Sequence, residues 1–202
     1  MTVAALVLYA VWAVLAFGLR AWIQWRRTGD TGLRGIGSSP GSARWWAGLL
    51  VAAGLLVCAA GAVAAAAGAE PLPVLDHAPV RSGGLVLALA GVAATVAAQL
   101  AMGASWRVGV QVDERTELVT DGVFGLVRNP IYTAMIATLA GLVAMGPNPV
   151  SVCGLVLSVI ALELQVRAVE EPYLRRTHGD AYRRYAAAVG RFVPAIGRTG
   201  PN

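Results

Sequence analysis

NPIYTAMIATLAGLVAMGPNPVSVCGLVLSVIAL, residues 129–162, is the stretch of sequence that decides the fold. It holds no charged side chain, and its 34 residues exceed the roughly 20 apolar residues that one membrane-spanning helix needs. The sequence GPNP at 146–149 interrupts it with residues that are typical of turns. We therefore predict a tight hairpin of two short membrane helices, over residues 130–146 and 149–168.

Three more uncharged stretches precede the hairpin, over residues 2–19, 45–69 and 82–106. Each has the length of one membrane helix. The first lacks the basic residues and the cleavage site of a signal peptide, so we expect it to be retained. With 57% hydrophobic and 13% charged residues, the chain of 202 residues differs from a soluble domain. We predict an all-α integral membrane protein with about five transmembrane helices and a cytoplasmic C-terminal helical segment.

The basic residues indicate how these helices are oriented. All 16 are arginines, and the formal net charge is +5. Fifteen of the 16 lie in or beside the first and third connections between helices or in the C-terminal tail, and only Arg81 lies elsewhere. Because basic loops stay on the cytoplasmic side, we expect the N-terminus outside and the C-terminus inside the cytoplasmic membrane. The basic charge then reflects topology and not a nucleic-acid surface.

Small residues recur every seven positions on two predicted helices, which lets helix backbones approach closely in a membrane. They are Gly54, Gly61 and Gly68 on one helix, and Gly84, Gly91 and Ala98 on the next. We predict that both rows lie at helix–helix contacts. The glycine-rich stretch 29–42 lacks the GK[ST] element of a phosphate loop, and we interpret it as part of a flexible cytoplasmic linker over residues 26–44.

Two polar segments remain, and the predicted topology brings both to the cytoplasmic end of the hairpin. In the first, residues 107–132, Asn129 is placed to cap the following helix and Pro130 to occupy its first turn. Tyr132 then lies near the membrane surface. A capped helix start with an interfacial tyrosine explains this segment when it is taken alone.

The second polar segment covers residues 163–185. Glu163 lies in an apolar stretch, where carboxylates usually face a partner or a polar cavity. Arg167 follows on the same helix face, so an internal ion pair and a ligand contact are both open for Glu163. Pro172 predicts a break or kink near residues 171–172. The two histidines and two cysteines of the chain are isolated in sequence, so we expect no metal site.

Three motifs in the last 100 residues resemble the isoprenylcysteine carboxyl methyltransferase and phospholipid methyltransferase family. They are LVTDGVFGLVRNPIY at 118–132, EEPYL at 170–174 and HGDAYRRYAAAVGRFVP at 178–194. Members of that family typically have LV-x-x-G-x-[YF]-x-x-x-R-H-P-x-Y, then E-E-x-x-L, then F-G-x-x-Y-x-x-Y. Three N-terminal membrane helices (1–106) would then precede a methyltransferase core (107–202). The core would contain a cofactor segment (107–130), the hairpin (130–168) and a C-terminal helix and tail.

The resemblance implies a membrane-embedded enzyme that takes a methyl group from S-adenosylmethionine and leaves S-adenosylhomocysteine. The family binds this cofactor with the LV stretch, the R-H-P-x-Y turn and the first Glu of E-E-x-x-L. A polar residue before the LV stretch also contributes, for which Gln111 is the candidate. Carried over to this chain, the cofactor-binding residues are Gln111, Leu118, Val119, Phe124, Asn129, Pro130, Tyr132 and Glu170.

This chain departs from the family pattern at three positions. Asn129 replaces the motif histidine, which keeps a hydrogen-bonding side chain but removes a titratable group. Phe124 occupies the position that is often tyrosine, and loses its hydroxyl. Prenylcysteine-type members carry an arginine four residues before the first Glu, where this chain has Val166, with Arg167 beside it. A shift by one residue turns a side chain by about 100° around a helix, so Arg167 would present its charge in a different direction.

We expect Arg128, Glu163 and Arg167 to act in catalysis. A carboxylate acceptor needs only alignment with the methyl donor, whereas an amine or hydroxyl acceptor needs a base, for which Glu163 is the candidate. We favour carboxylate O-methylation over amine N-methylation, with a lipophilic or prenylated acceptor that comes from the membrane lipid phase. The alternatives are a small membrane transporter, a non-catalytic membrane subunit, and a family member that has lost activity.

Overall fold

The computed structural model describes residues 1–31, 39–103 and 117–200. In this part of the chain the fold is all-α, as predicted, and four helices are long and apolar enough to cross a membrane. They are Thr2–Thr28, Ala43–Ala66, Ala78–Ala101 and Pro149–Ala188. A fifth apolar helix, α5 (Pro130–Met145), is shorter, with 16 residues. It forms the predicted hairpin with α6 (Pro149–Leu164).

The two longest helices each contain a segment of π-helix. The first is continuous through α1 (Thr2–Ala13), the π-helical η1 (Val14–Leu19) and α2 (Arg20–Thr28). The last continues from α6 through the π-helical η5 (Gln165–Glu170) into α7 (Glu171–Ala188). Between them lie α3 (Ala43–Ala66), α4 (Ala78–Ala101) and the short 3₁₀ helix η4 (Gly122–Gly125).

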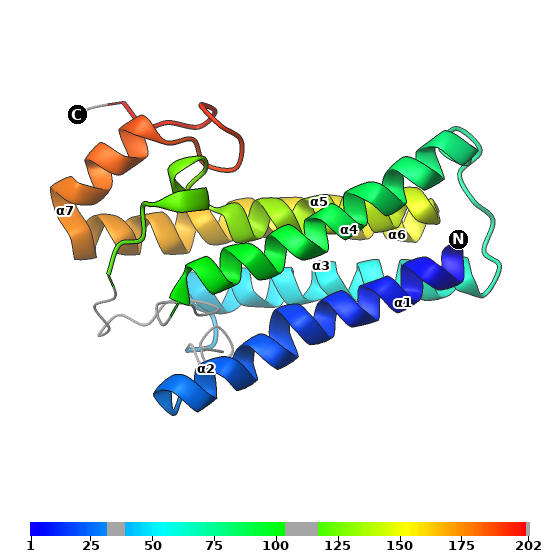
Figure 1. The fold of residues 1–202 in the computed structure, drawn as a ribbon, viewed down its shortest axis with the longest axis horizontal. Helices are drawn as coiled ribbons and strands as arrows, with labels where there is room; N and C mark the ends of the chain where they lie inside the picture. Colours follow the sequence, from blue (N-terminus) through cyan, green and yellow to red (C-terminus); the bar gives the residue numbers. More distant parts are fainter. Residues whose placement is uncertain (32–38, 104–116, 201–202) are drawn as a thin grey trace.

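The expected break near residues 171–172 is wrong. Pro172 lies in the first turn of α7, directly after the π-helical segment, where its missing N–H requires no partner within the helix. The helix bends instead at Gly179, whose backbone angles (φ 52°, ψ −123°) are not helical. Because a positive φ is easily adopted only by glycine, the bend occurs at the residue that tolerates it. The second half of α7 therefore turns away from the axis of α6 (Figure 1).

Glycines set the closest helix contacts, in the two rows that the sequence indicates. A Cβ atom on Gly61 of α3 would lie 2.5 Å from the backbone nitrogen of Ser151 on α6. One on Gly91 of α4 would lie 2.6 Å from the backbone nitrogen of Thr138 on α5. Backbones this close leave no room for a side chain, so α3 packs tightly on α6 and α4 on α5. Gly54, Gly84 and Ala98 also lie at buried positions in these rows.

Gly68 does not belong to its row, which corrects the prediction for this residue. The helix α3 ends at Ala66, and Gly68 follows it with φ 92° and no atom near the position of a Cβ. It ends the helix in a left-handed conformation and makes no contact between helices.

Polar side chains connect α1 and α2 to the rest of the bundle. Gln99 of α4 donates from Nε2 to the carbonyl oxygen of Ala16 in η1, at 2.9 Å. Arg20 is buried and donates from Nη2 to the carbonyl oxygen of Gly103, just after α4, at 2.6 Å. Both bonds satisfy polar groups that would otherwise be costly in the apolar interior.

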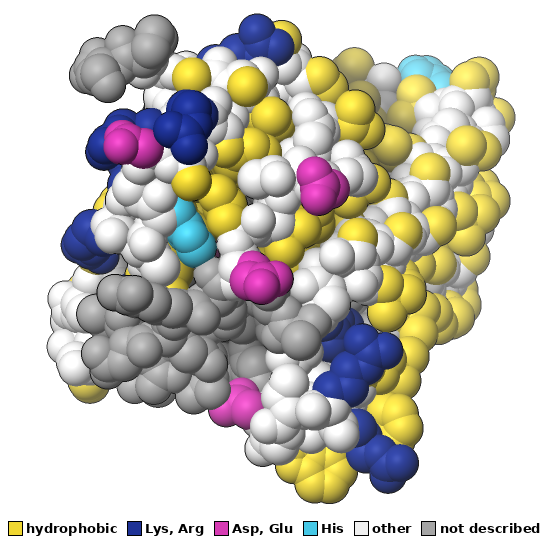
Figure 2. Space-filling view, turned by 60° about the vertical axis from the view of Figure 1, so that its left-hand side comes forward, with side chains coloured by type: hydrophobic (Ala, Val, Ile, Leu, Met, Phe, Trp, Pro, Cys, Tyr) yellow, Lys and Arg dark blue, Asp and Glu magenta, His cyan; other side chains and the backbone are white. Residues whose placement is uncertain are grey.

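The charged residues gather at one end of the bundle. The ends of α2 and α4, the starts of α3 and α5, and the whole of α7 with the tail lie at this end, whereas the 67–77 and 146–148 connections lie at the other (Figure 1). Every described arginine except Arg81 lies in or beside these elements, in α2 or in η5, which leads into α7. Arg81 pairs with Asp76 at the opposite end. We call the end that carries the other arginines the arginine end. Figure 2 shows charged side chains at this end and hydrophobic side chains along the flank of the helices.

Candidate functional site

The centre of the arginine end is the turn that leads into α5, residues 127–133, and it is held by the tail of the chain. The backbone N–H of Arg128 donates to the carbonyl oxygen of Gly190 at 2.8 Å, and that of Asn129 donates to the oxygen of Arg191 at 3.0 Å. Val127 and Gly190 form an isolated parallel β-bridge. Residues 62 positions apart in the sequence are thereby fixed side by side.

Asn129 lies at the predicted cap position of α5, but its side chain has a different partner. Its Nδ2 donates to the carbonyl oxygen of Arg191 at 3.1 Å, and it makes no side-chain bond to the helix start. Thr133 adds a bond from Oγ1 to the carbonyl oxygen of Phe192, at 2.8 Å. Pro130 occupies the first turn of α5, as predicted. The amide at position 129 therefore connects the turn to the tail.

Arg128 lies under this turn in a buried ionic network. Its Nη1 donates to Glu171 Oε1 and to the hydroxyl of Tyr182, both at 3.0 Å, and its Nη2 donates to the carbonyl oxygen of Gly197 at 2.7 Å. The side chains of Arg128 and Glu171 are only 2% and 7% exposed. Three partners from two segments hold the guanidinium in one position.

Arg191 binds the same carboxylate through two bonds. Its Nε lies 2.6 Å from Glu171 Oε1, and its Nη2 lies 3.2 Å from Oε2. These hydrogen bonds to Glu171 raise the pKa of Arg191 above its already high usual value. Arg175 approaches Oε2 from outside at 3.8 Å. One carboxylate thus holds two buried guanidinium groups.

Glu170 and Tyr132 connect the two motif segments. The hydroxyl of Tyr132 on α5 donates to Glu170 Oε1 at 2.5 Å, across 38 positions in the sequence. Gln165 Nε2 lies 3.3 Å from the same oxygen. No described residue donates a hydrogen bond to the second oxygen, Oε2, and the side chain is half-buried. Glu170 therefore has one oxygen fixed by the protein and one oxygen open to a ligand.

The remaining expected cofactor residues lie before the turn. Phe124 is buried in η4, and its carbonyl oxygen accepts a bond from the hydroxyl of Tyr185 at 2.6 Å. Leu118 and Val119 are half-buried in the non-helical segment just before η4. Gln111 lies outside the described residues.

Glu163 and Arg167 form the ion pair that the sequence leaves open as one possibility. Arg167 Nε lies 2.5 Å from Glu163 Oε2, and the two side chains are 59% and 36% exposed. Ile160 and Leu164 are exposed on the same stretch of helix. The pair therefore lies on the outer surface of α6 and η5, beside exposed apolar side chains of a helix that is long and apolar enough to cross a membrane.

Sequence reasoning missed the residues that hold the site together. Glu171, Tyr182 and Arg191 lie within the quoted motifs, yet only Arg128 of the buried network was selected from the sequence. A charged residue between glycine and phenylalanine, as at 191, is a weak indication of a buried partner. No spacing rule connects it to Glu171, because the contact depends on the bend at Gly179 and the return of the tail.

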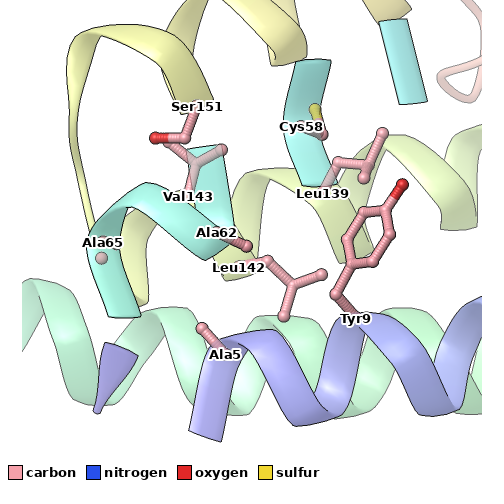
Figure 3. A pocket seen from close by; sticks show the side chains of 10 residues that line it. Ala5, Tyr9, Cys58, Ala62, Ala65, Leu139, Leu142, Val143 and Ser151 are labelled. Atoms are coloured by element: carbon pink, nitrogen blue, oxygen red, sulfur yellow. The ribbon is translucent and has the colours of Figure 1, made fainter. Parts of the chain in front are cut away.

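A small apolar cavity lies in the opposite half of the bundle. Tyr9, Cys58, Leu139, Leu142 and Ser151 are among the side chains that line it (Figure 3). The hydroxyl of Tyr9 donates to the carbonyl oxygen of Leu55 at 2.7 Å. No charged side chain lines this cavity.

Known proteins resemble a large part of the chain. Residues 80–181, just over half of the chain, match the family model described as phospholipid methyltransferase. Protein-S-isoprenylcysteine O-methyltransferase A of Arabidopsis thaliana is 30% identical over 123 residues, which cover 60% of this chain and 62% of the relative. Protein-S-isoprenylcysteine O-methyltransferase B of Arabidopsis thaliana is 29% identical over 89 residues, which cover 44% and 45%. The chain spans less than two thirds of the length of either relative. The family match and the motif residues joined at the arginine end together place this chain in the phospholipid methyltransferase family.

Proposed function

We propose that this protein transfers a methyl group from S-adenosylmethionine to a lipophilic acceptor at the arginine end of its helix bundle. The observation that carries the proposal is the contact between Tyr132 and Glu170, at 2.5 Å. It joins the R-N-P-x-Y turn to the E-E-x-x-L segment, the two motifs to which the family resemblance assigns cofactor binding. The family match supports the class of reaction.

The residues at this contact fit the cofactor. S-adenosylmethionine supplies an activated methyl group, and it offers ribose hydroxyls and an ammonium group that a carboxylate can bind. Tyr132 fixes Oε1 of Glu170, which leaves Oε2 for such a donor. Leu118, Val119, Phe124, Asn129 and Pro130 would complete the site, together with Gln111. Asn129 would act through the backbone it holds, because its amide is bound to the tail.

Arg128 acts in this proposal by positioning the turn. Its guanidinium is buried and bound to Glu171, Tyr182 and the carbonyl oxygen of Gly197. A group with these partners is poorly placed to contact an acceptor that arrives from the membrane. It keeps the R-N-P turn, and with it Tyr132, at a fixed distance from Glu170.

Glu163 and Arg167 are the residues that would contact the acceptor. Their ion pair lies on the proposed lipid-facing surface. A charged group of a molecule in the membrane would replace one member of the pair and bind the other. A carboxylate acceptor would bind Arg167 and would need no base, whereas an amine would need Glu163 to take its proton. We favour the carboxylate. Both Arabidopsis relatives bear the name of O-methyltransferases, and their similarity supports this choice.

The proposed location is the cytoplasmic membrane, with the N-terminus outside and the site facing the cytoplasm. The support comes from the distribution of the arginines, because basic residues are retained on the cytoplasmic side. A membrane-impermeant thiol reagent applied to intact cells would test the orientation on two variants with one engineered cysteine each, at Glu70 and at Arg198, which lie at opposite ends of the bundle. Labelling at position 70 alone supports the proposed orientation, and labelling at position 198 alone contradicts it.

Calorimetric titration of the detergent-purified full chain with S-adenosylhomocysteine tests the cofactor assignment. We expect binding by the wild-type chain and a loss of at least about tenfold in affinity for Glu170→Gln, because the open oxygen would no longer carry negative charge. Glu70→Gln is the matched control, since Glu70 is exposed at the opposite end of the bundle. Absence of binding by the wild-type chain would refute the cofactor. Equal affinity in Glu170→Gln would refute the role of this residue.

The acceptor is identified by labelled methyl transfer. Membranes that contain the protein are incubated with S-adenosylmethionine carrying an isotopic methyl group, and the lipid extract is examined by mass spectrometry. A labelled methyl ester supports O-methylation, and a labelled methylamine supports the amine alternative. Cofactor binding with no labelled product would identify a family member without catalysis.

A further inference from the structure

The helix α2 presents a surface that the candidate site does not use. Trp22, Trp25 and Arg26 are spaced three and four residues apart, so they share one helix face, and all three are exposed. The opposite face of α2 is buried against the bundle and contains Arg20, Ala21 and Gln24. The exposed face therefore points away from the protein.

Aromatic residues dominate this surface. Trp22 and Trp25 are each about half exposed. Tryptophan is enriched where a membrane meets water, because its ring is apolar and its N–H is polar. We call the exposed residues Trp22, Trp25, Arg26 and Arg27 of α2 the collar.

The length of the first helix places the collar at the membrane surface. Residues Thr2–Thr28 form 27 residues of helix, which extend about 40 Å at 1.5 Å per residue. The hydrocarbon core of a membrane is about 30 Å thick. The uncharged stretch 2–19 is long enough to cross nearly all of it, so α2 emerges among the lipid headgroups.

The charge of the collar is positive, and no described carboxylate forms an ion pair with it. The α2 sequence RAWIQWRRT carries three arginines and no carboxylate. The guanidinium of Arg26 lies over the ring of Trp22, 5.4 Å from its centre, which directs it along the surface. Among the ion pairs of the described residues, none involves Arg26 or Arg27. Dark blue and yellow atoms lie together at the lower edge of Figure 2, where α2 projects in Figure 1.

We propose that the collar binds the headgroup of an anionic phospholipid. The lipid phosphate accepts hydrogen bonds from Arg26 and Arg27, and its upper acyl chain lies along Trp22 and Trp25. A zwitterionic lipid offers the same phosphate but adds a cation that the two arginines repel. The collar thereby favours anionic over zwitterionic lipid beside α2, independently of the methyl-transfer site.

Fluorescence quenching by brominated lipids tests the proposal on the full chain. The protein is reconstituted into phosphatidylcholine vesicles in which a rising share is brominated phosphatidylglycerol or brominated phosphatidylcholine. We expect at least about fivefold preference for phosphatidylglycerol in the wild type, since one cation near the surface contributes about 1 kcal/mol. Trp22→Phe with Trp25→Phe should reduce the quenched share of the fluorescence. Arg26→Gln with Arg27→Gln should abolish the preference, so that phosphatidylglycerol and phosphatidylcholine bind about equally.

Two matched variants distinguish the effect of the collar arginines from the effect of the net charge of the protein. Arg183→Gln with Arg184→Gln removes the same charge from an exposed part of α7 and should keep the preference. Arg26→Lys with Arg27→Lys should also keep most of it, which excludes misfolding as the cause of the loss. An unchanged preference in the Arg26 and Arg27 glutamine variant overturns the proposal, as does an equal loss in the α7 variant. Competition by free inorganic phosphate would show an ion site and would equally overturn lipid binding.

Discussion

Arg128 and Glu171 are 43 residues apart in the sequence and form a buried ion pair at 3.0 Å, and Arg191 shares the same carboxylate. The three side chains join the turn before α5, the start of α7 and the tail. Burial of two cations with one anion is costly unless every hydrogen bond is made. Removal of a single partner should therefore have a large effect on stability.

Glu171→Gln should lower the free energy of unfolding by about 3–5 kcal/mol, because it leaves two buried guanidinium groups without a counter-charge. Thermal and denaturant unfolding of the detergent-purified protein would measure the loss. Glu163→Gln removes a carboxylate from an exposed pair and should cost less than about 1 kcal/mol. Similar losses in the two variants would show that the buried network contributes little.

Tyr132→Phe should weaken binding of S-adenosylhomocysteine by about tenfold, because the hydrogen bond that fixes the Glu170 carboxylate is lost. Tyr9→Phe is a suitable control. It also removes a hydroxyl that donates one hydrogen bond, to Leu55, but at the other end of the bundle. It should lower stability by about 1 kcal/mol and leave binding unchanged. Titration calorimetry on both variants would distinguish a local effect at Glu170 from general destabilisation.

Gly84→Ala should destabilise the bundle, whereas Gly83→Ala should not. A Cβ atom on Gly84 would lie 2.7 Å from the carbonyl oxygen of Gly141 on α5, while one on Gly83 would meet open space. We expect a loss of about 1–3 kcal/mol for the first and a small gain for the second, since alanine favours helix over glycine. Unfolding midpoints of the two neighbouring variants provide the measurement. Equal midpoints would contradict the close packing of α4 on α5.

Arg167→Gln should abolish most methyl transfer to a carboxylate acceptor without changing the affinity for S-adenosylhomocysteine. Arg176→Gln, at an exposed position of α7, should leave both unchanged. Transfer of labelled methyl groups to membrane lipids would be measured beside cofactor titration. If Glu163→Gln loses more activity than Arg167→Gln, the base role of Glu163, and with it an amine acceptor, is supported instead.

Composition and spacing predict most of the fold. The start of each hairpin helix and the end of α5 follow from the GPNP turn and lie close to the expected residues. The expected end at residue 168 is wrong, because the helix continues from α6 through η5 into α7. Gly61 and Gly91 lie at helix contacts, as their spacing indicates, because close packing in lipid selects small residues. The prediction that Gly68 lies at a helix contact is wrong, because periodicity alone does not show that α3 ends two residues earlier.

The contacts of the site are less visible in the sequence. Tyr132 and Glu170 are selected through the motif resemblance, and the structure joins them. The contact between Glu171 and Arg191 depends on a bend at Gly179 and on π-helical geometry over Gln165–Glu170, and neither follows from apolar spacing. The bond from Arg128 to the backbone oxygen of Gly197 cannot be predicted from the sequence, because every residue type carries such an oxygen.

The return of the tail onto the turn before α5 has a consequence for biosynthesis. The oxygens of Gly190, Arg191, Phe192 and Gly197 bind the turn and its neighbours, and this segment leaves the ribosome after every helix that it contacts. The apolar helices can enter the membrane beforehand. The turn before α5 lacks its hydrogen bonds to the tail until the chain has been synthesised through residue 197. The newly inserted bundle therefore has its helical architecture before the turn at the arginine end is ordered.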